Sequence, residues 1–513
     1  MRAMPFRRAW LPDLLAFSVP GALALGIATE LTRPVTAGPV SFDVGGEVIH
    51  FERLVHGHRL EQYLTTTPKP ILTLVYGLLH AWTDDWRAIS WASILVFGLA
   101  VALLTLVVRR VAGTAPAAFV GIGLAGSALL LEDVGLALGW GWALLFLACA
   151  AAALTQPAPR YAVAGFAMAA AVLVRIELLV VVAGIGLVLV VAALVPRLPR
   201  PPRGAWFLLL GGLALPVMLL HDALLIGDPL FWAKISGYYS AGAPDLRDIG
   251  ELAAAVWARY RAIPLLVILA VLGVVELLRM RQWALGTGLL LLGPGIAAFM
   301  FFLALRGTFV PDRYLIPVDA SLIVAAGFSL HAVRLRPAIV AATRRVVAPL
   351  RATLLAAGVA LLAIIITPTW ALIDAPARTV VFNQRWLMID LRAVLPVLRA
   401  EVEERPAIRA FPAGDGDGEP TFFVPVRARP MIAADLGLPL TEVASTFGPN
   451  IDLGAGYPRP GQVLFHDMHG ERYLVGFEPF QIDAPVEVGG VRLVPLAANP
   501  DRGYWVVAIE PGA

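Results

Sequence analysis

The N-terminal two-thirds of the chain is built from long apolar runs that polar residues rarely interrupt. Each run is about 20 residues long, which is the length of helix that crosses a hydrocarbon core. A core helix of a soluble protein would instead show polar residues at helical spacing. We therefore predict a polytopic α-helical membrane protein with about eleven spans. The predicted spans are residues 11–31, 88–108, 114–131, 134–154, 160–174, 176–195, 205–226, 262–279, 284–305, 314–333 and 352–373.

Two long polar loops separate some of these spans, at residues 32–87 and 227–261. Within the first loop the pattern predicts a helix over residues 44–63. Residues 70–82 are apolar but too short to span a bilayer, which favours an interfacial or re-entrant helix.

The pattern changes after about residue 374, where charged residues, proline and glycine become frequent. It predicts a helix over residues 384–404 and strands over 421–426, 462–465, 473–477, 491–495 and 504–509. We therefore divide the chain into a transmembrane domain, residues 1–373, and a small α+β domain, residues 374–513.

The distribution of charge predicts how the chain is oriented. Only 15% of the residues are charged, compared with about 25% in an average soluble protein. Short arginine-rich loops belong in the cytoplasm, and alternate loops carry Arg109, Arg110, Arg160, Arg197, Arg200, Arg203, Arg279, Arg281, Arg334, Arg336, Arg344, Arg345 and Arg351. We expect a plasma-membrane protein with a cytoplasmic N-terminus, an uncleaved first span, and both long loops and the C-terminal domain outside. No basic run alternates with aromatic residues, so nucleic acid is not an expected partner.

The first outer loop contains two acidic residues at helical spacing, Asp43 and Glu47. A carboxylate at Asp43 suits a general base or a ligand of a divalent metal ion, and it also suits a helix N-cap. Glu47 lies on the same face if a helix begins at Asp43.

Lysine is rare in this chain, which has 40 basic residues of which only Lys69 and Lys234 are lysines. Both lie in the long outer loops. Lysine is a compact point charge that suits phosphate. The alternative is that two surface lysines were retained by chance.

Three further polar groups lie at predicted outer turns. Glu132 and Asp133 form a polar turn or supply a second acid. Arg175 and Glu177 suit an ion pair that locks a turn. Arg313 and Tyr314 open the tenth span, where they suit either phosphate binding or anchoring at the interface.

Taken in order, these motifs resemble those of the membrane-embedded glycosyltransferases with the GT-C fold. The resemblance is to the branch of protein O-mannosyltransferases and lipid A aminoarabinose transferases, and it covers about residues 10–335. Its elements are Asp43, the Thr67–Leu72 stretch with Lys69, the Glu132–Asp133 turn, the Val174–Glu177 turn, and the Arg313–Pro317 element. In two of these elements this chain departs from the family, at three positions: Ile71 replaces a second proline, and Val174 and Ile176 replace threonine and proline.

The resemblance implies an inverting transfer of a sugar from a polyprenyl-phosphate donor to a glycan, lipid or protein acceptor outside the cytoplasm. Asp43 would then be the base, or would bind a divalent metal where family members use one, and Glu132 or Asp133 would assist. Lys69 and Arg313 would hold the donor phosphate, with Tyr314 and Lys234 as further candidates.

Three other functions remain open from the sequence. A transporter or flippase would need charged residues near mid-membrane, and the predicted spans have few there. A ligase of lipid-linked glycans would also have basic outer loops. A non-catalytic scaffold would keep the same motifs for packing.

Overall fold

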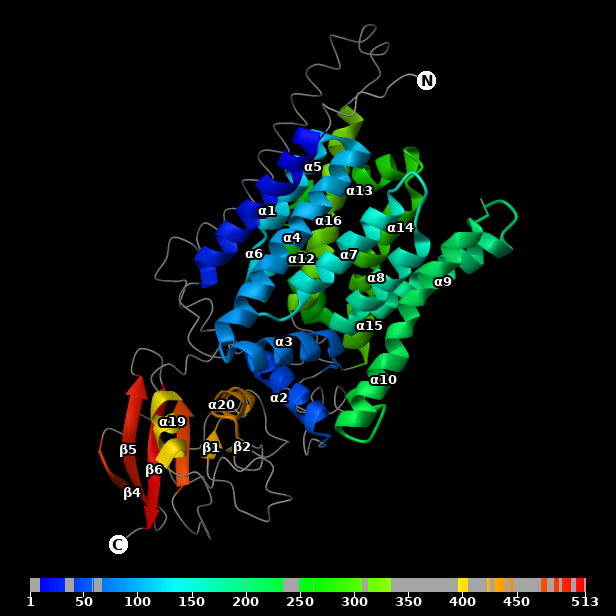
Figure 1. Cartoon of the computed structure of the whole chain (residues 1–513). Helices are drawn as coiled ribbons and strands as arrows, with labels where there is room; N and C mark the ends of the chain where they lie inside the picture. Colours follow the sequence, from blue (N-terminus) through cyan, green and yellow to red (C-terminus); the bar gives the residue numbers. More distant parts are fainter. Residues whose placement is uncertain are drawn as a thin grey trace.

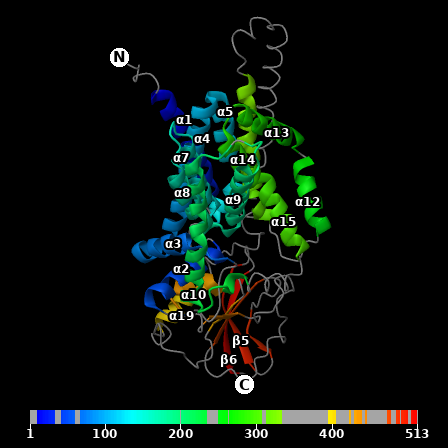
Figure 2. The same ribbon diagram turned by 90° about the vertical axis from the view of Figure 1, so that its right-hand side faces the viewer.

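The computed structural model describes residues 10–32, 41–57, 59, 67–198, 200–233, 249–261, 263–306, 312–333, 395–404, 422–424, 429–438, 443–445, 472–477, 484–488, 491–499 and 504–511. Its helices form an elongated bundle, and strands with two further helices lie at one end of it (Figure 1). A view turned by 90° shows strands β5 and β6 below the bundle as well (Figure 2). The structure is therefore helical in the N-terminal part and mixed in the tail.

The first part of the bundle begins with one long helix and two helices from the first outer loop. The elements are α1 (Trp10–Thr32), α2 (Phe42–His56), α3 (Pro70–Thr83), α4 (Trp86–Ala112), α5 (Thr114–Ala125), α6 (Ala128–Gly135), α7 (Trp140–Leu154) and α8 (Tyr161–Val174).

The second part follows in the order η2 (Ile176–Leu178), α9 (Leu179–Leu194), η3 (Arg203–Leu213), α10 (Ala214–Leu225), α12 (Ile249–Arg261), α13 (Pro264–Arg279), α14 (Trp283–Leu290), η4 (Leu291–Gly295), α15 (Ile296–Leu305), η5 (Asp312–Leu315), α16 (Ile316–Ser329) and η6 (Leu330–Val333).

The structure does not confirm the predicted number of about eleven spans. Five described helical segments are long and apolar enough to cross a membrane, or up to seven if each of two bent pairs is one span. Four further apolar helices are shorter: α3, α7, α8 and α16. The predicted third span is broken by a 50° bend between α5 and α6, and helix α7 of the fourth begins only at Trp140. The predicted span 352–373 lies outside the described residues.

Arginines at the end of the bundle away from α2 and α3 pair with the few acidic residues there. Arg109, in the last turn of α4, bonds to Asp13 in the first turn of α1. Arg279 donates to both oxygens of Glu276 at 2.6 Å. This end is the one that the arginine pattern assigns to the cytoplasm, an orientation that stays a prediction.

The described strands of the tail form one mixed sheet in the order β2-β1-β3-β6-β5-β4. β1 pairs in parallel with β2 and β3, and the other pairs are antiparallel. The strands are β1 (Phe422–Val424), β2 (Val443–Ser445), β3 (Arg472–Phe477), β4 (Val486–Val488), β5 (Val491–Asn499) and β6 (Tyr504–Pro511). Four of them fall at predicted strands, β2 and β4 were not predicted, and residues 462–465 and the boundary near residue 374 lie outside the described residues.

Two helices of the tail connect it to the bundle, α19 (Leu395–Glu404) and α20 (Arg429–Leu436). Helix α20 packs on α2. The indole N–H of Trp86 donates to Asp435 at 2.9 Å, and Arg399 of α19 donates to the same carboxylate at 2.6 and 3.0 Å. The tail is thus joined to the end of the bundle where α2 and α3 lie (Figure 1).

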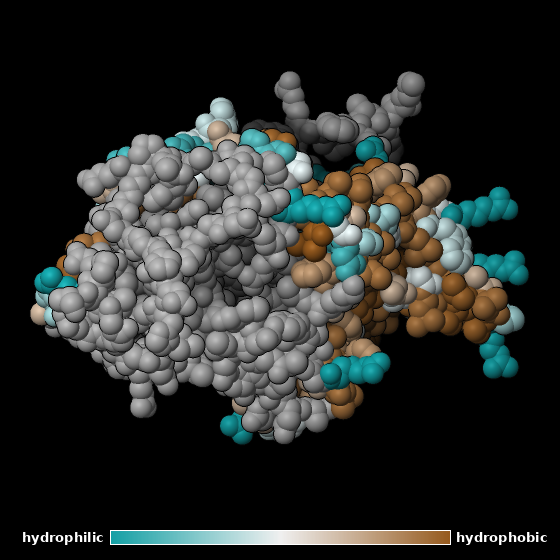
Figure 3. Space-filling model, turned by 90° about the horizontal axis from the view of Figure 1, so that it is seen from below, coloured by the Kyte–Doolittle hydropathy of each residue, from teal (hydrophilic) through white to brown (hydrophobic). Residues whose placement is uncertain are grey.

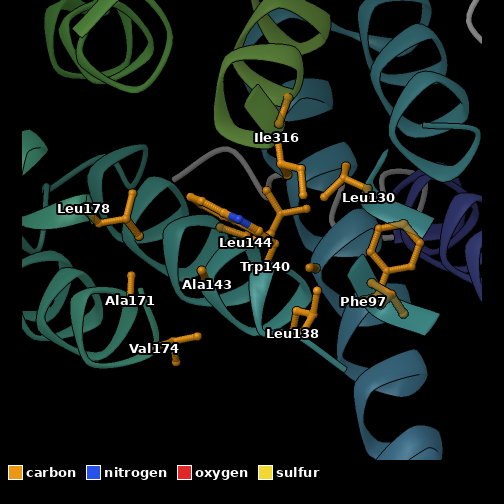
Figure 4. Close-up of a cluster of buried hydrophobic side chains, with 14 of the residues drawn as sticks. Phe97, Leu130, Leu138, Trp140, Ala143, Leu144, Ala171, Val174, Leu178 and Ile316 are labelled. Carbon is orange, nitrogen blue, oxygen red and sulfur yellow. The ribbon is translucent and has the colours of Figure 1, made fainter. Parts of the chain in front are cut away.

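Apolar side chains fill the inside of the bundle and also cover much of its outside. Figure 4 shows the Trp140 ring in the middle of a buried cluster, with Leu178, Ile316 and Leu130 around it. On the outside, Leu187 and Leu194 of α9 are 65% and 74% exposed. A view from below shows hydrophobic residues over much of the described surface at its right-hand side (Figure 3). Such an outer surface suits contact with lipid.

Candidate functional site

Helices α2 and α3 pack against each other at the lower end of the bundle (Figure 1). The Ser41 side chain caps α2 by accepting the Val44 N–H at 3.3 Å, and Gly57 ends it at φ 69°. Pro70 occupies the first turn of α3, where its missing N–H costs nothing. Since Ser41 is the N-cap, Asp43 does not cap α2, and its carboxylate points to other partners.

Lys69 joins the two helices through a buried ion pair. Its Nζ lies 2.6 Å from Oδ2 of Asp43 and 3.9 Å from Oε1 of Glu47. Asp43 and Glu47 therefore share one face of α2, as their spacing predicts. All three residues are at most 2% exposed.

Burial of these charges is expensive. Taking an ammonium and a carboxylate out of water costs several kcal/mol per ion, and apolar residues in their place are often as stable. A buried ion pair of this kind contributes little net free energy to folding, so a functional role for it is favoured.

The ionisable groups of α2 respond to this burial. Burial raises the pKa of Glu47 to about 8, against the opposing effects of the Lys69 charge and the Thr73 hydrogen bond. Burial also holds the pKa of His50 well below its usual value, assisted by His221 and Lys69. Near neutral pH, Glu47 is therefore protonated and His50 is neutral.

A second set of polar groups continues from Glu47 to helix α10. The Thr73 hydroxyl bonds to Oε2 of Glu47 and lies 3.3 Å from Nε2 of His221. Nδ1 of His221 lies 3.4 Å from Asp222, whose other oxygen accepts the Trp232 N–H at 3.0 Å. These residues, Glu47, Thr73, His221 and Asp222, are called here the polar chain.

The turn after α6 is held by Asp133 and Arg175. Oδ2 of Asp133 accepts the Trp140 N–H at 2.7 Å, and Oδ1 accepts from Arg175 at 3.1 Å. Arg175 also lies 3.9 Å from Glu177 and stacks on the Trp140 ring at 4.9 Å. Arg175 thus hydrogen-bonds to Asp133, which the sequence did not predict as its partner, while its ion pair with Glu177 is the longer contact.

This turn is tied to α2 and α3. Ser41 donates to the Leu136 carbonyl at 3.0 Å, and the Tyr76 hydroxyl donates to the Ala137 carbonyl at 2.9 Å. Gly139 has φ 109°, a conformation that strongly favours glycine. Asp43 and Tyr314 both lie near enough to Arg175 to act on its charge, so the two groups of ionisable residues adjoin.

The remaining predicted residues are less fully placed. Glu132 is half-buried and lies beside Asp133 in α6. Arg313 belongs to η5, directly before α16, but its side chain lies outside the described residues, as does all of Lys234. The structure therefore brings Asp43, Glu47 and Lys69 together and leaves the contacts of Arg313 and Lys234 undescribed.

The described residues do not fit a divalent metal ion. No group of three or more His, Cys, Asp or Glu side chains among them is arranged to hold one. The Lys69 ammonium already lies at the carboxylates of Asp43 and Glu47. A cation of the protein thus occupies the place where two acidic residues of α2 would otherwise bind a metal.

Sequence reasoning did not identify Thr73 and His221 as site residues. Thr73 lies four residues after Lys69, so helical spacing was a usable signal for it. His221 and Asp222 belong to helix α10, and His221 lies 148 residues after Thr73 in the chain. No local pattern connects them to α2.

Comparison with known proteins gives a structural match only. No protein-family model matches the sequence, and no curated protein matches it. The crystal structure of the apo oligosaccharyltransferase of Archaeoglobus fulgidus matches with a TM-score of 0.52 and 13% identity, covering 93% of this chain and 70% of that one. A crystal structure of the same protein in complex with Zn and sulfate has a TM-score of 0.47 and 12% identity, covering 83% and 62%.

At this level of identity the likeness shows the fold alone. The match extends over nearly the whole chain, and it agrees with the resemblance seen in the sequence at the level of the class but not of the branch. The chain therefore has a fold similar to that of this oligosaccharyltransferase.

Proposed function

We propose that this protein is a membrane glycosyltransferase that moves a sugar from a polyprenyl-phosphate donor to an acceptor hydroxyl outside the cytoplasm. The observation that carries the proposal is the buried Asp43–Lys69 pair at the lower end of the GT-C-like bundle. It offers a carboxylate for the acceptor proton and a cation for a phosphate leaving group, which are the two groups that such a transfer needs.

In the proposed reaction the acceptor oxygen bonds to the anomeric carbon of the sugar. The bond from that carbon to the phosphate oxygen breaks, and its electron pair stays on the phosphate. The hydroxyl proton passes to Asp43, and the Lys69 ammonium offsets the charge that develops on the phosphate. Inversion requires the acceptor and the phosphate on opposite faces of the sugar.

The proposed reaction requires Lys69 to occupy two positions, one beside Asp43 and one beside the donor phosphate. Its Nζ cannot stay 2.6 Å from Asp43 and also bind a phosphate on the far side of the sugar. The donor phosphate therefore draws the flexible lysine side chain away from Asp43, which leaves the carboxylate as an available base. Arg313 and Tyr314, at the start of α16, are proposed as further groups for the phosphate.

The first test identifies the sugar that is transferred, and the second measures the effect of replacing Asp43. Cells with and without the protein are compared by mass spectrometry of their envelope glycans, and we expect loss of one sugar from a polymer, lipid or protein. The polyprenyl-phosphate donor of that sugar is then used with the purified protein in proteoliposomes.

Under these conditions Asp43→Asn is expected to lower transfer by at least about a hundredfold, the usual range for a lost general base. Asp84→Asn is the matched control, because Asp84 is an exposed acid at φ 48°, a conformation that asparagine tolerates. An unchanged glycan profile, or full transfer by Asp43→Asn, would contradict the proposal.

A further inference from the structure

The polar chain has two complete hydrogen-bonding arrangements that differ by the position of one proton. In the first, the Thr73 hydroxyl donates to Glu47 and accepts from N–H of a doubly protonated His221. In the second, a protonated Glu47 donates to Thr73, and Thr73 donates to Nε2 of His221. A threonine hydroxyl has one proton and two lone pairs, so it fits both.

Glu47 is placed to receive a proton on one oxygen and release one from the other. Oε1 lies 3.9 Å from Nζ of Lys69, and Oε2 bonds to Thr73. The proposed transfer to Oε1 therefore requires Lys69 to approach Glu47 to within hydrogen-bond distance. At the far end, Nδ1 of His221 lies 3.4 Å from Oδ1 of Asp222. These side chains are between 0% and 6% exposed. Among the described residues, a proton therefore moves along the polar chain itself and does not pass to bulk water midway.

We propose that Glu47, Thr73 and His221 form a proton relay that returns Asp43 to its ionised form after each sugar transfer. This inference rests on the proposed function, in which Asp43 takes up the acceptor proton. Asp43 and Lys69 are catalytic residues in this scheme, and Glu47, Thr73 and His221 are positioning residues that act through them.

After the lipid phosphate leaves, Lys69 returns to Asp43, takes the proton of the carboxyl group and gives one of its own to Oε1 of Glu47. Glu47 releases its proton from Oε2 to Thr73, whose own proton moves to Nε2 of His221. His221 is the most exposed member of the polar chain, at 6%, and releases the proton to water. Glu47 is then protonated on Oε1, and rotation of its carboxyl group returns the proton to the Thr73 side.

The groups that face Glu47 come from each element packed on α2. They are Asp43 and His50 of α2 itself and Lys69 and Thr73 of α3, with His221 of α10 reached through Thr73. From α20, Asp435 is bonded to Trp86 and Arg399 instead. The raised pKa of Glu47, about 8, agrees with a resting carboxyl group that carries the proton.

The main test compares Thr73→Val with Thr73→Ser in proteoliposomes, using the polyprenyl-phosphate donor of the sugar identified above. Valine keeps the volume but removes the hydroxyl, and serine restores it. We expect Thr73→Val to lower kcat by about ten- to a hundredfold with donor KM unchanged and with an altered pH profile. Thr73→Ser is expected to stay within about threefold of the natural protein, since it can relay a proton.

Two results overturn the relay. One is a Thr73→Val variant with the natural kcat and pH profile. The other is an equal loss in the valine and serine variants, which assigns the effect to packing of the methyl group.

A second measurement needs no donor and separates this proposal from the proposed function. Infrared titration follows the protonated carboxyl band that disappears in Glu47→Gln. We expect Thr73→Val to shift the pH at which this band is lost, because it uncouples Glu47 from His221. If the natural protein transfers no sugar, the proposed function fails. If Thr73→Val leaves the Glu47 titration unchanged, the relay fails, whatever the activity.

Discussion

At the scale of single residues, Glu47 and Lys69 show how burial sets chemical state. Two carboxylates and one ammonium share a space closed to water, so only one carboxylate is compensated fully. The ion pair at 2.6 Å belongs to Asp43, and burial raises the pKa of Glu47 to about 8. The two acids of one helix face are therefore held in different protonation states.

A pH dependence of stability follows from Glu47. Its pKa is about 8 in the folded chain and 4.5 as a free group. Between these values the folded state keeps a proton that the unfolded state has lost, so the contribution of Glu47 to stability falls as pH rises, by up to about 1.4 kcal/mol per pH unit.

Glu47→Gln removes this dependence. We expect thermal unfolding in detergent micelles to show the variant gaining stability relative to the natural protein as the pH is raised from 5 toward 8. The exposed acid Asp85, replaced by asparagine, provides the control. A stability difference that stays constant over this range would contradict the assignment.

Part of the site was predictable from sequence at this scale. Asp43 and Glu47 were placed on one face by their spacing, and Lys69 stood out because lysine is rare and Pro70 follows it. The direct contact of Lys69 with Asp43 was not predictable, since it depends on how α2 and α3 cross. His221 was not predictable either, because no periodicity relates α10 to α2.

At the scale of elements, the crossing of α2 and α3 depends on Gly77. A Cβ atom there would lie 2.0 Å from Cγ of Phe51. The absence of a side chain lets the two helices approach until Lys69 and Thr73 reach the carboxylates of α2. The apolar helices were predictable from hydropathy, but the bend between α5 and α6 and the start of α7 at Trp140 were not. The residues between α6 and α7 are themselves apolar, so hydropathy does not mark the break; Ala137, for example, adopts a turn conformation at φ 51°.

Gly77→Ala is therefore expected to destabilise the protein by about 1–3 kcal/mol, as overpacking usually does. Thermal unfolding in micelles measures the change. Gly288→Ala in α14 is the matched control, since nothing lies within 4 Å of its added Cβ. Combining Gly77→Ala with Phe51→Ala relieves the clash, and a cost that persists in full in the double variant would rule out this explanation.

At the scale of the whole molecule, the two ends of the bundle differ in charge and chemistry. One end carries the site and the tail, and the other carries the ion pairs of Arg109 and Arg279. The arginine pattern predicts that the second end is cytoplasmic.

Cysteine labelling tests this orientation. The chain has one cysteine, Cys149, so Cys149→Ala supplies a cysteine-free background. Thr83 and Ala158 are exposed residues at opposite ends of the bundle. We expect a membrane-impermeant maleimide to label Thr83→Cys in intact cells and Ala158→Cys only after permeabilisation. The reverse result would place the site in the cytoplasm.

The contact between α20 and α2 has a consequence for biosynthesis. Helix α2 bears the acidic residues and packs against α20, and the two segments are separated by most of the chain. A ribosome completes the helical bundle well before it delivers Asp435 to Trp86. We therefore expect nascent chains that stop before α20 to insert into the membrane without the contact between α20 and α2. Sugar transfer is then expected only after α20 has been synthesised.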